Sequence, residues 1–107
     1  MIVAVDFDGT LIEEVEFPQL SYSLLPNASE VIRELHNKGV EFVLCTARYG
    51  WYFIPAVVFI KKNKLPIKIF YGKPNADIYI DNKNLGTELI DWLKIKEAIY
   101  EKYLLKP

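Results

Sequence analysis

Two aspartates lie two residues apart where an apolar run ends in a glycine. The run Ile2–Val5 is short, apolar and mostly β-branched, which is typical of a strand buried in a parallel sheet. Asp6 and Asp8 follow it, and Gly9 permits a tight turn. Two carboxylates near one bound group can share a phosphoryl transfer, because one can attack while the other handles protons. Alternatively, both are simple turn residues, since Asp and Gly are common where a strand ends.

Further polar residues follow the later apolar runs. Thr46 comes directly after the predicted strand Val40–Cys45, and Asp81 after the predicted strand Ile78–Ile80. Lys73 stands between a glycine and a proline. A hydroxyl can donate to a phosphate oxygen, and an ammonium can balance phosphate charge. Taken singly, a threonine at a strand end and a lysine in an exposed loop are both commonplace.

The elements that must hold these residues alternate between strands and helices. Asn27 is expected to cap a helix that ends at Gly39, and a last helix is expected to begin at Thr87 or Glu88. The chain between them predicts a helix over Pro55–Lys64 and a strand over Ile67–Phe70. This alternation predicts an α/β fold: a three-layer, doubly wound parallel sheet of about four strands with helices on both faces. In such sheets, ligands bind beyond the carboxyl ends of the strands.

The order of these motifs resembles that of the haloacid dehalogenase superfamily. The stretch Val3–Leu11, with Asp-x-Asp-Gly-Thr after an apolar lead-in, resembles the first signature. Thr46, Lys73 and the stretch Asp77–Asn82 resemble the second, third and fourth signatures, in the family's order. The resemblance extends from Ile2 to about Asn82 and implies a Rossmann-like core. No interval is long enough for a cap domain.

The resemblance implies a magnesium-dependent phosphomonoester hydrolase that forms an aspartyl-phosphate intermediate. Asp6 corresponds to the nucleophile and Asp8 to the general acid and base. Mg²⁺ ligands would be Asp6, the main-chain carbonyl of Asp8, and Asp81. Phosphate contacts would come from Gly9, Thr46 and Lys73, with exposed amides at Gly9 facing phosphate oxygens.

Three residues leave alternatives open. Asn82 stands where the commonest fourth signature has a second acid; it can orient a metal-bound water but removes one negative charge, so weaker Mg²⁺ binding is expected. A phosphate- or metal-binding module with little turnover is therefore an alternative, and a phosphotransferase would use the same residues. Arg48 can contact phosphate or pair with an early glutamate, and we weigh these equally. Trp51 belongs either to the core or to a substrate entrance or subunit contact.

Composition limits the number of domains, the class of partner and the cellular location that the sequence predicts. The 107 residues suit a single domain, 1–107, and 51% hydrophobic with 25% charged residues is the balance of a globular protein. A net charge of −1 does not indicate a nucleic-acid or membrane partner. One cysteine, Cys45, and no secretion signal favour the cytoplasm. The expected partner is a phosphorylated substrate of unknown identity. The resemblance to members without a cap leaves the open site two alternatives: a macromolecular substrate, or a homo-oligomer in which a neighbour covers the site.

Overall fold

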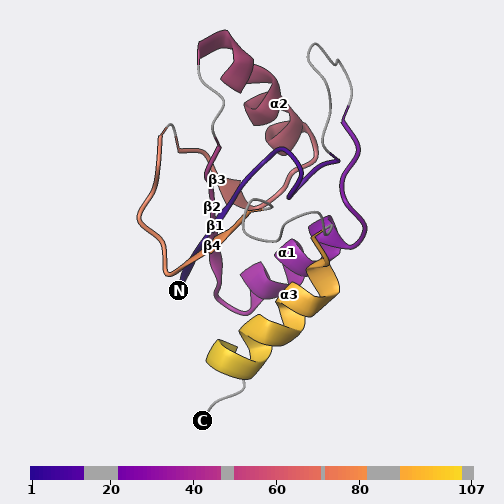
Figure 1. The fold of residues 1–107 in the computed structure, drawn as a ribbon, viewed down its shortest axis with the longest axis vertical. Helices are drawn as coiled ribbons and strands as arrows, with labels where there is room; N and C mark the ends of the chain where they lie inside the picture. Colours follow the sequence, from indigo (N-terminus) through magenta and orange to yellow (C-terminus); the bar gives the residue numbers. More distant parts are fainter. Residues whose placement is uncertain (14–21, 47–49, 71, 82–89, 105–107) are drawn as a thin grey trace.

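Four parallel strands form one sheet in the order β3-β2-β1-β4 (Figure 1). The computed structural model describes residues 1–13, 22–46, 50–70, 72–81 and 90–104. The central strand β1 pairs with β2 on one side and with β4 on the other. The chain therefore builds the sheet in one direction as far as β3 and returns to the other side of β1 for β4. This reversal confirms the predicted α/β class with a doubly wound parallel sheet. The strand bounds are β1 (Ile2–Val5), β2 (Glu41–Leu44), β3 (Ile67–Lys68) and β4 (Ile78–Ile80).

The described residues form three α-helices beside the sheet, and α1 and α3 lie side by side (Figure 1). Their bounds are α1 (Ala28–Asn37), α2 (Ile54–Lys62) and α3 (Trp92–Ile99), with a 3-10 turn before α2 and a π-helical turn after α3. Asn27 occupies the N-cap of α1 as expected, but it is left-handed (φ 66°) and makes no side-chain cap bond. Asp91 caps α3, where its Oδ1 accepts from the amides of Leu93 and Lys94. No described helix is long and apolar enough to cross a membrane.

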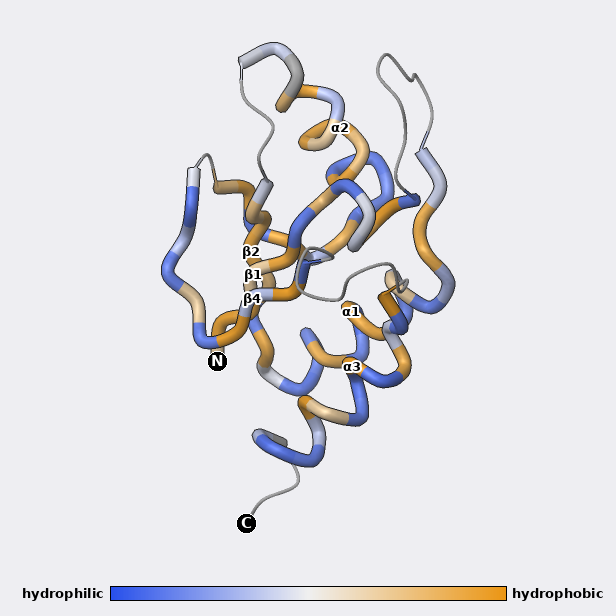
Figure 2. Tube along the Cα trace, viewed as in Figure 1, coloured by the Kyte–Doolittle hydropathy of each residue, from blue (hydrophilic) through white to orange (hydrophobic). Residues whose placement is uncertain are grey.

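The main core lies on one face of the sheet. Val3 pairs in register with Phe42, and Val5 with Leu44 and Ile80, so these side chains point the same way. All five belong to one buried cluster, which residues of all three helices join: Val31, Ile32 and Leu35 of α1, Ala56 and Ile60 of α2, and Trp92 and Ile99 of α3. Hydrophobic residues accordingly dominate β1 and β2 in Figure 2.

The opposite face of the sheet carries no helix among the described residues, which do not include 82–89. Ala4 and Val43 are buried there but lie outside the main cluster, and Tyr79 is 42% exposed. The described part of the segment 69–77, which connects β3 to β4, contains no helix. Its nine residues are fewer than a helical crossover usually needs, and they include Gly72 and Pro74.

Helix α2 has an exposed apolar side. Ile54 is 59% exposed and Val58 55%, one turn apart on α2, and Trp51, on the 3-10 turn before α2, is 66% exposed. Trp51 therefore is not a core residue. Phe59 turns inward instead, and its ring meets those of Phe7 and Tyr22 edge to face.

Candidate active site at the strand ends

Asp6 and Asp81 follow adjacent strands at the point where the strand order reverses. The Asp6 amide donates to the carbonyl of Ile80 over 3.0 Å, which continues the β1–β4 ladder by one residue. On the other side of β1, the Cys45 amide donates to the carbonyl of Val5 over 2.8 Å, directly before Thr46. The sheet therefore brings Asp6, Thr46 and Asp81 to one edge, as the sequence predicts, and this edge is the usual ligand position in such folds.

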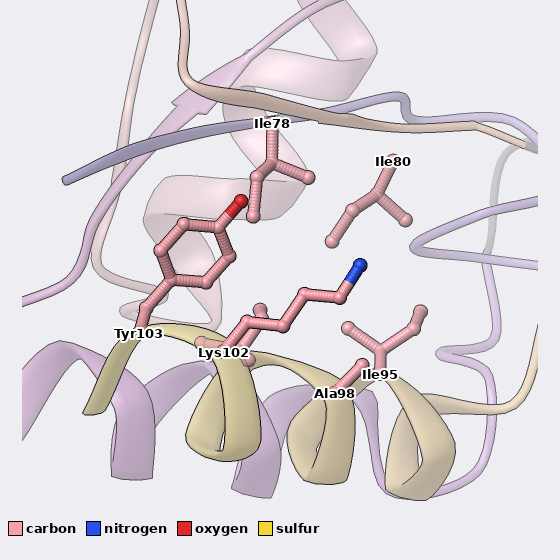
Figure 3. Close-up of a pocket in the computed structure, with 7 residues that line it drawn as sticks. Ile78, Ile80, Ile95, Ala98, Lys102 and Tyr103 are labelled. Atoms are coloured by element: carbon pink, nitrogen blue, oxygen red, sulfur yellow. The ribbon is translucent and has the colours of Figure 1, made fainter. Parts of the chain in front are cut away.

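Side-chain alternation assigns both carboxylates to the face of the sheet opposite the main core. Val3, Val5 and Phe7 are all fully buried in the main core, so Asp6 between the last two points to the opposite side. Ile78 and Ile80 point toward α3, where they line a pocket of about 270 Å³ (Figure 3). Asp81 follows Ile80 in the same alternation, and so emerges on the face of Asp6. The pocket against α3 lies on the other face and is not part of this site.

The turn after Asp6 is closed by backbone hydrogen bonds. The carbonyl of Phe7 accepts from the amides of Leu11 and Ile12, at 3.1 and 3.2 Å. Gly9 has φ 77°, a conformation that favours glycine. Its amide donates to the carbonyl of Ile12 over 3.0 Å. This amide is engaged within the turn, where Gly9 shapes the backbone that carries Asp8. The phosphate contact expected at Gly9 stays a prediction.

The Asp6 carboxylate is oriented by the backbone beside it. Its Oδ1 accepts from the amide of Phe7 over 2.9 Å. Because Phe7 is fully buried, this amide is itself fixed in place. The contact helps to set the direction of the Asp6 side chain, at the end of a strand that pairs with two neighbours.

The Trp92 side chain makes a hydrogen bond with the turn that carries Asp8, a contact that the sequence did not predict. Its Nε1 donates to the carbonyl of Thr10 over 2.8 Å, and both residues are fully buried. The hydroxyl of Thr10 finds no partner among the described residues. Helical spacing predicts only that Trp92 faces the core. A buried indole N–H usually has an acceptor, which is a signal that some such contact exists, but the sequence does not identify the carbonyl.

The position of α3 is reinforced by polar contacts with α1. Tyr100 Oη donates to Glu34 Oε2 over 2.7 Å, and Lys96 Nζ lies 3.6 Å from Glu34 Oε1. The hydrogen bond from Tyr100, followed by the charge of Lys96, lowers the pKa of Glu34, while the same hydrogen bond raises the pKa of Tyr100. These contacts join α1 to α3, the helix that begins at Trp92, and to the turn after α3; none of them involves a residue at a strand end.

Lys73 lies on the segment between β3 and β4. It is exposed, and its Nζ is 5.7 Å from the centroid of the Tyr79 ring. Tyr79 stands between Ile78 and Ile80, so its ring projects on the face of Asp6 and Asp81. Arg48 and Asn82 lie outside the described residues. Of the predicted site residues that the structure describes, Lys73 alone lies on the segment between β3 and β4.

The donor chemistry at the strand ends fits a magnesium ion. No group of three or more histidine, cysteine or acidic side chains that could hold a metal ion occurs among the described residues. Asp6 and Asp81 supply carboxylates, and the Asp8 carbonyl is a further oxygen. Mg²⁺ is commonly held by one or two carboxylates together with water. The ligand roles of these three residues remain predictions.

Comparison with known proteins agrees with this arrangement. The family model described as haloacid dehalogenase-like hydrolase matches residues 3–72, about two thirds of the chain. The chain belongs to this family. Its matched segment includes Asp6, Asp8 and Thr46, whereas Lys73 and Asp81 lie beyond it. No curated protein matches the chain.

A solved structure is similar to this chain over nearly its whole length. It is a conserved protein from Bacteroides thetaiotaomicron, with 30% identity and a TM-score of 0.80. The match covers 95% of this chain and 91% of the other. Similar lengths agree with a core that carries no cap domain. Membership in the family supports a hydrolase activity.

Proposed function

We propose that the protein is a magnesium-dependent phosphomonoester hydrolase that forms an aspartyl-phosphate on Asp6. The observation that supports this most directly is the placement of Asp6 and Asp81 after adjacent strands, on the same face of the sheet, with Asp8 in the turn that follows. A phosphate bound beyond these strand ends would meet the two strand-end carboxylates directly. Family membership supports hydrolysis in general, and the acid at Asp8 favours phosphate esters.

The reaction would proceed in two displacements at phosphorus. A carboxylate oxygen of Asp6 attacks phosphorus, the bond to the ester oxygen breaks, and Asp8 gives its proton to the leaving alkoxide. In the second step, Asp8 takes a proton from water, whose oxygen attacks phosphorus and releases inorganic phosphate and the Asp6 carboxylate. The Thr46 hydroxyl and the Lys73 ammonium would bind phosphate oxygens and balance their growing charge.

Magnesium would offset the repulsion between these carboxylates and a phosphate dianion. Members of the superfamily generally use Mg²⁺. Asp6, Asp81 and the Asp8 carbonyl would hold the ion through oxygen, and waters would complete its shell. The charge that it supplies would let a phosphate approach two acids that otherwise repel it.

Hydrolysis of an aryl phosphate tests the proposal. Purified protein should release phosphate with Mg²⁺, lose this activity in chelator, and lose it in Asp6→Asn. The matched control is Asp77→Asn, the same chemical change at the opposite end of β4, where Asp77 Oδ2 accepts from the Ile2 amide over 2.7 Å. Activity that survives in Asp6→Asn would contradict the assignment of the nucleophile.

The same preparations separate the alternatives. Binding of Mg²⁺ and phosphate without turnover would favour a binding module, and phosphate transfer to an added alcohol would favour a phosphotransferase. A homo-oligomer that covers the open site and a cytoplasmic location stay predictions. Light scattering coupled to size exclusion tests the first. The phosphorylated substrate must be found by a screen.

A further inference from the structure

Tyr79 makes three contacts with the segment that carries Lys73. Its ring centroid lies 5.7 Å from Lys73 Nζ, within the range of a cation–π interaction. Its hydroxyl donates to the Pro74 carbonyl over 2.6 Å and accepts from the Ala76 amide over 3.1 Å. The Tyr79 side chain is 42% exposed, yet it is bound to the loop through its ring and through both hydrogen bonds of its hydroxyl. We propose that Tyr79 is a positioning residue that holds Lys73 toward bound phosphate.

The place of Tyr79 in the sheet supports this role. Tyr79 pairs with Ala4 in register, and Asp6 and Asp81 each follow two residues later in their strands. Two residues of strand span about 7 Å, so the ring lies one step from both carboxylates, on their face of the sheet. A lysine that rests on this ring is held near the site, although its own segment arrives from the far edge strand β3.

The loop itself offers Lys73 little other support. Among the described residues, the segment 72–77 contains no helix, and Lys73 is exposed. A lysine side chain has many rotamers, and each one lost on binding weakens a contact. The Tyr79 hydroxyl fastens the backbone just after Lys73, and the ring attracts the ammonium without neutralising it. The charge therefore stays available to a phosphate.

This inference rests on the proposed function, because it assigns Lys73 to the phosphate. Its test is a double-mutant cycle on the binding of inorganic phosphate in the presence of Mg²⁺, measured by calorimetry. Four proteins enter the cycle: wild type, Tyr79→Leu, Lys73→Gln and the double variant. Tyr103→Leu is the matched control, because Tyr103 is similarly exposed (49%) but lies on the π-helical turn after α3.

Tyr79→Leu should weaken phosphate binding about two- to fivefold, the usual strength of a partly exposed cation–π contact. The same change should have no effect once Lys73 is glutamine, and Tyr103→Leu should have none in either background. Tyr79→Phe keeps the ring but frees the loop backbone, and should fall between wild type and Tyr79→Leu. An equal loss in both Lys73 backgrounds, or no loss at all, would overturn the proposal.

Failures of the two proposals are distinguishable. A wild type that binds phosphate with Mg²⁺ but never hydrolyses an ester contradicts the hydrolase and leaves the cycle intact. A wild type that hydrolyses, with Tyr79→Leu binding phosphate equally well, contradicts the positioning role alone. A wild type that neither binds phosphate nor hydrolyses an ester overturns both, and one that hydrolyses an ester but binds no phosphate overturns the positioning role alone.

The contact can also be measured without phosphate. Ring currents of Tyr79 should shift the Lys73 side-chain methylene signals in ¹³C-lysine-labelled protein. Tyr79→Leu should move these signals to the values of the other exposed lysines, and Tyr79→Phe should retain most of the shift. Signals that are unchanged in Tyr79→Leu would show that the ammonium does not rest on the ring, and would overturn the proposal.

Discussion

The substitution Trp92→Phe tests whether α3 holds the turn that carries Asp8. In the native protein, Trp92 Nε1 donates to the Thr10 carbonyl over 2.8 Å in a fully buried contact. Phenylalanine keeps an aromatic ring in the core but has no donor. The Thr10 carbonyl would then be buried without this partner, beside a hydroxyl that already finds none among the described residues.

Two costs set the size of the effect. A buried carbonyl left without its donor costs about 1–3 kcal/mol. The smaller ring leaves a void that adds about 1 kcal/mol. We therefore expect the free energy of unfolding to fall by about 2–4 kcal/mol, a large part of the roughly 5–15 kcal/mol typical of a domain. Because Asp8 lies two residues before Thr10, the phosphatase rate of the folded variant should also fall, by about tenfold or more.

Urea unfolding followed by circular dichroism measures the first effect, and the slope of the free energy against urea should be unchanged. Trp51→Phe is the matched control, because the same change at a side chain 66% exposed should stay within about 0.5 kcal/mol. Equal stability losses in Trp92→Phe and Trp51→Phe would refute the reasoning. Full activity in a folded but destabilised Trp92→Phe would confine the role of Trp92 to the core.

Two further predictions concern charge. Asn82→Asp should tighten Mg²⁺ binding about fivefold or more, because it adds a negative charge beside a doubly charged ion, and even two unit charges about 4 Å apart in water attract by about 1 kcal/mol. A titration that shows no gain in affinity would contradict the charge-deficit explanation. Tyr100→Phe should change the pH dependence of stability at both ends. The lowered pKa of Glu34 stabilises the fold above pH 4.5, the ordinary pKa of this group, and this stabilisation is lost as the pH falls through the pKa of the folded state. The raised pKa of Tyr100 stabilises the fold below pH 10.0, and this stabilisation is lost as the pH rises through the pKa of the folded state. Thermal unfolding from pH 3 to 11 should therefore give a flatter profile for the variant than for wild type, and identical profiles would contradict the coupling.

Local pattern was sufficient for much of the fold. The β-branched run Ile2–Val5 forms β1 with the bounds expected, because a strand buried on both faces needs apolar side chains throughout. Helix α1 buries Ala28, Val31, Ile32 and Leu35, as their spacing predicts. The strand Ile67–Phe70 is shorter than predicted, because only Ile67 and Lys68 find partners on β2. Strand ends depend on the neighbouring strand, which local sequence does not specify.

The sequence by itself determined the chemistry of the site. The types and order of Asp6, Asp8, Thr46 and Asp81 indicate the family, and parallel strands necessarily carry residues at their carboxyl ends to one edge. Only the tertiary structure decided which groups support them. The Gly9 amide is engaged by Ile12, and Trp92 reaches the Thr10 carbonyl from 82 residues away. Such contacts arise from the packing of elements that are distant in the sequence, and no periodic pattern of residues identifies their partners.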